Sequence, residues 1–166
     1  MDELKKLTVE SIVRALERAE RYRLLGEPCE AESICDDVLA VDPTNHEARV
    51  LLILSLTDQF RSDPSRADEA RTLAGELEDQ YERFYYSGIV RERVGKAQLA
   101  RGGPGSDDFA NRAMREAMAW YEQAEVIRPL GNDDSILRWN TCARTLARRG
   151  LTWRPVDVGG VPLLLE

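Results

Sequence analysis

A pattern of small residues and prolines occurs twice in this chain and constrains the fold more than any other feature. In each copy a small residue is followed, at fixed spacing, by two core positions and a proline. The eight positions are Ala31, Cys35, Val38 and Pro43, then Ala117, Tyr121, Ala124 and Pro129. The alanine allows a neighbouring helix to approach closely, the next two residues face a core, and the proline ends the helix. The pattern therefore predicts two related helices packed against partner helices.

Helix and turn signals divide the rest of the chain into segments of similar length. Apolar residues recur with helical spacing in seven segments, and none alternates with the two-residue period of a strand. The predicted helices span residues 8–25, 28–41, 45–60, 65–77, 81–100, 106–127 and 132–150. No proline or glycine occurs between Leu77 and Phe84, so this stretch fits either a tight turn near Asp79 or one long kinked helix.

The spacing around the first copy resembles that of the tetratricopeptide repeat (TPR) family. Ala15, Ala19 and Tyr22 precede it at the positions of a close-packing helix face, and the family's period is about 34 residues. The resemblance implies an all-α, TPR-like stack of about three antiparallel helical hairpins plus a capping helix in residues 1–150. Its third hairpin would be lengthened around residues 101–108, and residues 151–166 would form a non-helical tail.

Composition indicates a folded protein with few options for nucleic acid or membrane binding. Of the residues, 43% are hydrophobic and 32% are charged, and the net charge of −7 opposes contact with phosphates. Residues 1–79 hold nineteen acids and ten bases, whereas residues 80–166 hold eleven acids and thirteen bases. No apolar run approaches the roughly 20 residues of a membrane helix, and the N-terminus lacks a signal-peptide pattern. We therefore expect a cytoplasmic protein with no membrane partner.

Residues suited to catalysis or metal binding are few. Cys29, Cys35 and Cys142 match no paired-thiol motif, and His46 is the sole histidine. Adjacent acid pairs such as Asp133 and Asp134 lie at predicted helix starts, where negative charge favours the helix dipole. The sequence therefore predicts no catalytic residue, no metal, no cofactor and no enzymatic activity.

The TPR resemblance instead implies a protein–protein interaction module that binds a peptide or helix of another protein in a concave groove. In this family the first helix of each hairpin lines that groove. The resemblance assigns the groove candidates Glu20, Arg23, Asp58, Arg91, Asn140 and Arg144. Aromatic residues near the groove add Tyr85, Tyr86 and Trp139 as candidate anchors.

The sequence leaves open an alternative function for the seventh predicted helix and the contacts of the apolar C-terminal segment. Five arginines and no acid lie between Ser135 and Pro155, so the alternative function is a nucleic-acid-associated or regulatory protein that uses its seventh helix. The apolar segment Val161–Leu165 could lie on the chain's own helices, on a partner, or on a second copy as a homo-oligomer contact.

Overall fold

The computed structural model describes residues 3–151, and every regular element within that range is helical. A short 3-10 helix, η1 (Val9–Ser11), leads directly into α1 (Ile12–Leu24). The other helices are α2 (Pro28–Val41), α3 (His46–Gln59), α4 (Arg66–Gly75), α5 (Gln80–Arg101), α6 (Ser106–Val126) and α7 (Asp134–Arg148). The all-α prediction is confirmed for this range. The predicted non-helical tail lies, apart from Leu151, outside the described residues.

The turn between α4 and α5 decides between the two readings of residues 77–84. α4 ends at Gly75, and α5 begins only at Gln80. The side chain of Asp79 accepts a hydrogen bond from the Glu82 backbone N–H at 2.9 Å, which caps the new helix. The chain therefore makes a tight polar turn here and does not continue as one kinked helix.

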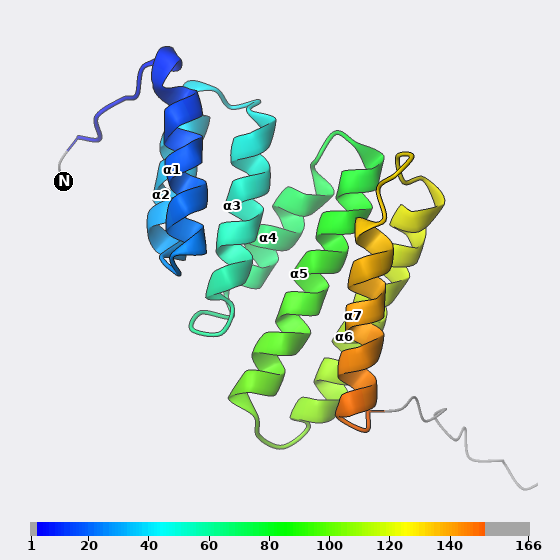
Figure 1. Ribbon diagram of the computed structural model, residues 1–166. Coiled ribbons are helices and arrows are strands. Elements are labelled where there is room, and N and C mark those ends of the chain that lie inside the picture. Colours follow the sequence, from blue (N-terminus) through cyan, green and yellow to red (C-terminus); the bar gives the residue numbers. More distant parts are fainter. Residues whose placement is uncertain (1–2, 152–166) are drawn as a thin grey trace, which may run out of the picture.

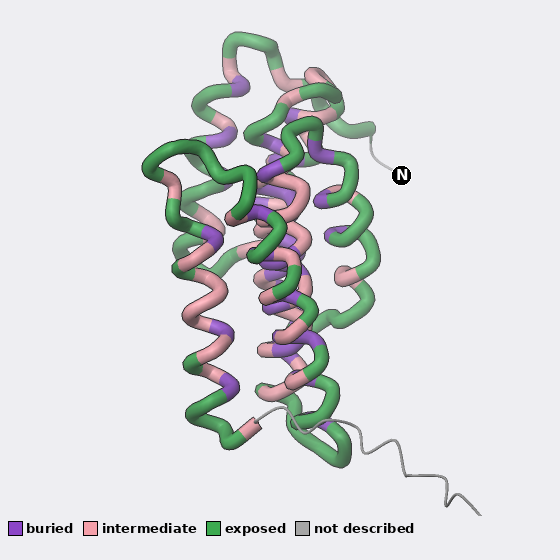
Figure 2. Tube along the Cα trace, turned by 90° about the vertical axis from the view of Figure 1, so that its right-hand side faces the viewer, coloured by how far each residue is buried: buried purple, intermediate pink, exposed green. Residues whose placement is uncertain are grey.

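The helices form two layers in which consecutive helices pack together and alternate in direction (Figure 1). α1, α3, α5 and α7 form the front layer, and α2, α4 and α6 lie behind them. Within the front layer α1 contacts α3, and α3 contacts α5. Figure 2 shows the same molecule from the side, with buried positions turned inward between the helices. None of the helices in residues 3–151 is long and apolar enough to span a bilayer.

Small residues sit where the helices approach most closely. Ala31 of α2 and Ala117 of α6 are both fully buried, as the repeated pattern predicts. α5 and α6 are the longest helices within residues 3–151, with 22 and 21 residues, so the two helices around residues 101–108 are lengthened as expected. Along this hairpin Gly88 faces the Tyr121 ring, and a Cβ on Gly88 would lie only 2.5 Å from Tyr121 Cε1. The helix pair therefore depends on the absence of a side chain at that position.

Candidate functional site

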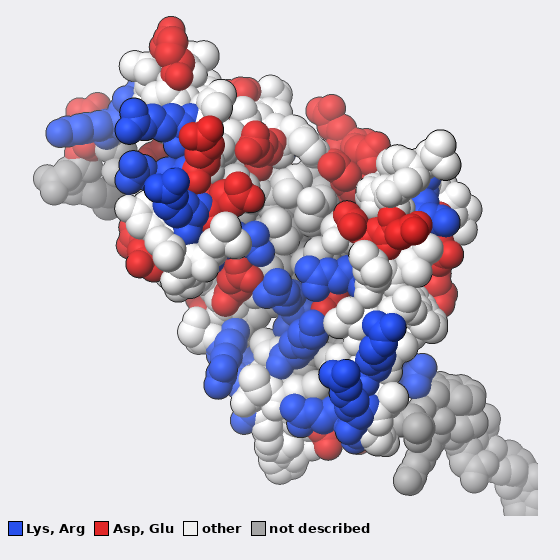
Figure 3. Space-filling view, in the orientation of Figure 1, with Lys and Arg blue, Asp and Glu red and all other residues white. Residues whose placement is uncertain are grey.

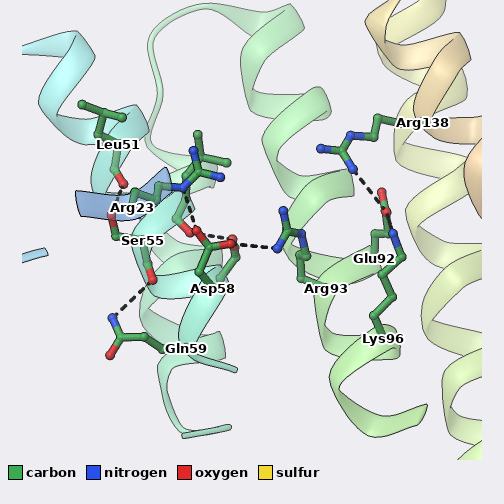
Figure 4. A network of polar contacts seen from close by, with 11 residues as sticks. Arg23, Leu51, Ser55, Asp58, Gln59, Glu92, Arg93, Lys96 and Arg138 are labelled. Atoms are coloured by element: carbon green, nitrogen blue, oxygen red, sulfur yellow. Dashed lines mark hydrogen bonds and ion pairs between the residues drawn. The ribbon is translucent and has the colours of Figure 1, made fainter. Parts of the chain in front are cut away.

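The front layer is held together by a carboxylate that bridges three helices. Asp58 of α3 accepts a hydrogen bond from Arg23 Nε of α1 at 2.7 Å through one oxygen. Its other oxygen accepts from an Arg93 terminal nitrogen of α5 at 2.8 Å (Figure 4). The Asp58 side chain is 21% exposed, so the bridge is partly accessible from the front face. Asp58 therefore fixes two arginines side by side on this face.

A second carboxylate, Glu92 of α5, lies completely inside the protein. It accepts a hydrogen bond from the Tyr121 hydroxyl of α6 at 2.6 Å. It also pairs with Lys96 one turn along α5 and with Arg138 of α7, the latter at 3.4 Å (Figure 4). Since a buried carboxylate without partners would cost several kcal/mol, these contacts offset the cost of burying Glu92. The network joins α5, α6 and α7.

Burial and this buried charge shift the acidities of neighbouring groups. Burial raises the pKa of the Tyr121 hydroxyl, and the adjacent Glu92 carboxylate raises it further. Burial, assisted by the same carboxylate, raises the pKa of the Cys142 thiol to about 12. For Arg138 burial alone would lower the pKa, but Glu92, Tyr85 and Tyr121 together outweigh burial and hold the pKa above the usual value. Arg138 therefore stays charged while it is anchored to the protein interior.

A hollow of about 270 Å³ opens between α3, α5 and α7, next to both networks. We call it the basic hollow. Four of its lining side chains are cationic, and Asp58 is its only acidic lining residue. The lining residues are Thr57, Asp58, Phe60, Arg61, Arg93, Lys96, Ala97, Ala100 and Arg138. Because Lys96 and Arg138 share the single charge of Glu92, the hollow keeps an excess of positive charge.

Charge is unevenly distributed over the front face. Figure 3 shows Lys and Arg gathered over the lower part of α5 and α7, with acidic residues toward the upper ends of the helices. At the start of α5 a second hollow is lined by Glu78, Asp79 and Glu82, together with His46 and Arg49. The α5 and α7 part of the front face is therefore basic at its lower end and acidic at its upper end, and a separate group of basic side chains lies over α1 (Figure 3).

Two of the predicted groove residues, Arg23 and Asp58, are brought together on the front layer by their ion pair. Glu20 lies one turn before Arg23 on α1 and is exposed, and none of the ion pairs found within residues 3–151 involves it. Arg23 and Asp58 were assigned to a groove through the TPR resemblance.

Arg91, another predicted groove residue, does not line the basic hollow. It pairs with Glu116 of α6, and its guanidinium lies 5.9 Å from the centre of the Phe109 ring. It therefore lines a different hollow between α4, α5 and α6. The α5 residues at the basic hollow are Arg93 and Lys96.

On α7 the residue at the basic hollow is Arg138, whereas the predictions named Asn140 and Arg144. Arg144 lies six positions after Arg138, which places the two side chains about 120° apart around the helix. Arg144 is exposed and Asn140 is partly exposed, and neither lines the basic hollow. The structure therefore places neither residue at the hollow that Asp58 lines.

The candidate aromatic anchors are partly buried packing residues. Tyr85 and Tyr86 meet edge-to-face at 5.2 Å, and Tyr85 also stacks on Tyr81. Burial raises the pKa of Tyr86 to about 12. Trp139 of α7 packs on the cluster around Tyr121, and its indole N–H donates to Glu122 Oε1 at 2.9 Å. These three residues hold α5, α6 and α7 together and do not line the basic hollow.

Within residues 3–151 no three His, Cys, Asp or Glu side chains are grouped so that they could hold a metal ion. His46 lies at the start of α3 and makes a 3.1 Å hydrogen bond with Glu82. Cys35 and Cys142 are buried free thiols, and Cys29 is exposed.

Comparison with known proteins yields no relative for this arrangement. No protein-family model, no curated protein and no solved structure matches the chain.

Proposed function

We propose that this protein is a TPR-like interaction module whose basic hollow binds an acidic segment of another protein. The observation that carries the proposal is the gathering of four cationic side chains, from the end of α3 and from α5 and α7, around one hollow in a protein of net charge −7. The two-layer packing and the closely approaching alanines support the TPR-like description. In this reading α1, α3, α5 and α7 form the binding face.

The anchoring of the hollow's cations favours a recognition role. Arg93 is held by Asp58, and Arg138 is held by Glu92, so both guanidinium groups are ordered before a partner arrives. Ordered groups lose less side-chain entropy on binding than mobile surface arginines do. A guanidinium also presents paired donors that match a carboxylate. An acidic peptide or the acidic face of a helix is therefore the partner of best fit.

A cytoplasmic location belongs to the same proposal. Three cysteines in an odd-numbered set without a paired spacing suit a reducing compartment.

Fluorescence anisotropy with two labelled peptides tests the proposal. One peptide is rich in glutamate and leucine, and the other replaces each glutamate with glutamine. The acidic peptide should bind and the glutamine peptide should not. In an Arg61→Gln, Arg93→Gln variant the affinity should fall roughly tenfold, as expected for the loss of two partly exposed ion pairs.

The matched control is an Arg144→Gln, Arg148→Gln variant, which removes the same charge from exposed positions of α7. This control should bind the acidic peptide as the unchanged protein does. Equal weakening in both variants would show that only overall charge matters. Tight binding of a short DNA duplex that falls steeply with salt and is lost in the control would instead favour the nucleic-acid alternative.

A further inference from the structure

The cations on the α3 side of the basic hollow outnumber the acids that pair with them. Arg23 and Arg93 share one carboxylate, that of Asp58, and each pairs with a different oxygen. Arg61 also lines the hollow and is exposed, and none of the ion pairs found within residues 3–151 involves it. A single acid therefore balances three arginines.

The same imbalance occurs around Glu92 on the α7 side of the hollow. Lys96 and Arg138 both pair with Oε1 of this carboxylate, which carries at most one negative charge (Figure 4). Because they contact the same oxygen, the ammonium and the guanidinium lie close to each other. An ammonium has three N–H donors and a guanidinium has five, so both side chains retain donors for a ligand.

The two networks together leave three positive charges in excess, because they contain five cations and two acids. This excess borders one hollow of about 270 Å³ and is not spread along a groove. One glutamate or aspartate side chain brings one charge and two oxygens, so it balances only part of the excess. A phosphorylated serine or threonine brings about −1.5 to −2 charges at pH 7 and three strong acceptor oxygens.

We propose that the basic hollow recognises a phosphorylated serine or threonine in the acidic segment of the partner protein. This inference rests on the proposed function and names the group that the segment presents to the hollow. Arg93 and Lys96 lie three positions apart on one side of α5, and Arg138 reaches the hollow from α7. The three phosphate oxygens accept hydrogen bonds from these three cations, and such charge-assisted bonds are about twice as strong as neutral ones.

The other groups of arginines do not have this excess from several helices. In the hollow between α4, α5 and α6, Arg71 pairs with Asp68. In the same hollow Arg91 pairs with Glu116, so each of these two arginines has an acid of its own. The exposed arginines of α1 lie beside Glu17 on a surface lined by that helix alone. The basic hollow is therefore the site that fits a compact dianion.

Fluorescence anisotropy with three labelled peptides tests this inference on the full chain. The peptides are identical except at one central position, which holds glutamate, phosphoserine or serine. The phosphoserine peptide should bind roughly tenfold more tightly than the glutamate peptide, and the serine peptide should bind most weakly. Equal affinities for phosphoserine and glutamate would overturn this inference and leave the proposed function standing. No binding of any of the three peptides would overturn both.

The pH dependence is a second measurement, and it depends on the phosphate itself. The second pKa of the phosphate is about 6, whereas that of a peptide glutamate is about 4.3. The affinity ratio of the two peptides should therefore shrink as the pH falls from about 7.5 to about 5.5. His46, the sole histidine, does not line the hollow, and the ratio cancels its effect on overall binding. A constant ratio would contradict recognition of a dianion.

Three variants locate the phosphate. Arg61→Gln changes an exposed position and leaves Asp58 and Glu92 with their partners, and it should weaken phosphoserine binding more than glutamate binding. Lys96→Gln should do so more strongly, with circular dichroism as the check of its fold. Arg148→Gln, an exposed change on α7 outside the hollow, is the matched control and should leave the ratio unchanged.

Two results would overturn the assignment. One is an equal loss of phosphoserine binding in the Arg61→Gln variant and in the Arg148→Gln control, because only overall charge would then matter. The other is displacement of the phosphoserine peptide by an equal concentration of inorganic phosphate, which would assign the hollow to a free anion.

Discussion

The helices α2 and α6 carry the same sequence pattern but build different surroundings. In α2 the central residue is Cys35, which is fully buried in an apolar cluster formed mainly by α1 to α4. In α6 the equivalent residue is Tyr121, also fully buried, but its hydroxyl contacts the buried Glu92 carboxylate. The larger side chain of Tyr121 thus packs against Gly88 and contacts the buried Glu92. Glu92 in turn pairs with two cationic side chains, Lys96 and Arg138.

This difference connects packing with binding in the second half of the molecule. The ring of Tyr121 occupies the space left by Gly88, and its hydroxyl helps to hold Glu92. Glu92 in turn anchors Lys96 and Arg138, which line the basic hollow. In the first half no equivalent chain of contacts leads from Cys35 to the surface. A change in the core near α6 is therefore expected to alter the proposed binding face, whereas a change near α2 is not.

The largest expected effect comes from making the two copies of the pattern alike. Tyr121→Cys removes the ring from a fully buried site and leaves Glu92 without its hydroxyl donor. The free energy of unfolding should fall by about 3–5 kcal/mol, the usual cost of emptying an aromatic site. Urea denaturation followed by circular dichroism measures it. A loss below 1 kcal/mol would contradict the close packing of α5 on α6.

The glycine opposite Tyr121 gives the next effect. Gly88→Ala places a Cβ against the tyrosine ring and should cost roughly 1–3 kcal/mol, even though alanine favours helix. Gly75→Ala in α4 is the matched control, because nothing lies within 4 Å of its Cβ. That control should be neutral or stabilising by up to about 1 kcal/mol. In a Tyr121→Cys background the Gly88→Ala penalty should shrink, and an unchanged penalty would mean that the two sites are not in contact.

Alkaline pH should lower the free energy of unfolding through Cys35 in the first half and through Tyr121 in the second half. Burial raises the pKa of the Cys35 thiol from 9.0 to about 12 and also raises the pKa of Tyr121 above 10.0. In both cases the folded protein keeps a proton that the unfolded chain releases, so stability is present below the unfolded pKa and is lost as pH rises above it. For one such group the loss is about 1.4 kcal/mol per pH unit.

Unfolding free energies measured between pH 8 and pH 11 test this assignment. The Cys35→Ala variant should reduce the loss that begins near pH 9, and the Tyr121→Phe variant should reduce the loss that begins near pH 10. Identical slopes in Tyr121→Phe and the unchanged protein would contradict the buried state of this hydroxyl.

The smallest effect on stability concerns the residue that joins the halves. Asp58→Asn removes the carboxylate between Arg23 and Arg93, and these pairs are partly exposed. The expected loss is about 0.2–1 kcal/mol per pair. Binding of the acidic peptide should become weaker, since Arg93 then loses the carboxylate that orders it before the peptide arrives. Anisotropy measures this change, and tighter binding would mean that the Asp58 carboxylate competes with the peptide for the arginines.

The sequence by itself determined the helices and their close contacts. Helical periodicity depends only on local spacing, and prolines and glycines act on their own neighbours, so six of the seven helix starts were placed to within two residues. Only the first start differed by more than two residues, because η1 precedes α1. The repeated pattern placed Ala31 and Ala117 at helix contacts, where the structure buries them completely.

The tertiary structure alone decided which polar residues share a surface. Periodicity gives the angle between two residues of one helix, but it does not say which neighbours surround that helix. For α5 this difference separates Arg91, which faces Glu116, from Arg93, which faces Asp58. The burial of Glu92 could likewise not be predicted from the sequence, because its partners Tyr121 and Arg138 lie 29 and 46 residues away. Contacts of that range depend on how whole helices pack, which local sequence spacing does not specify.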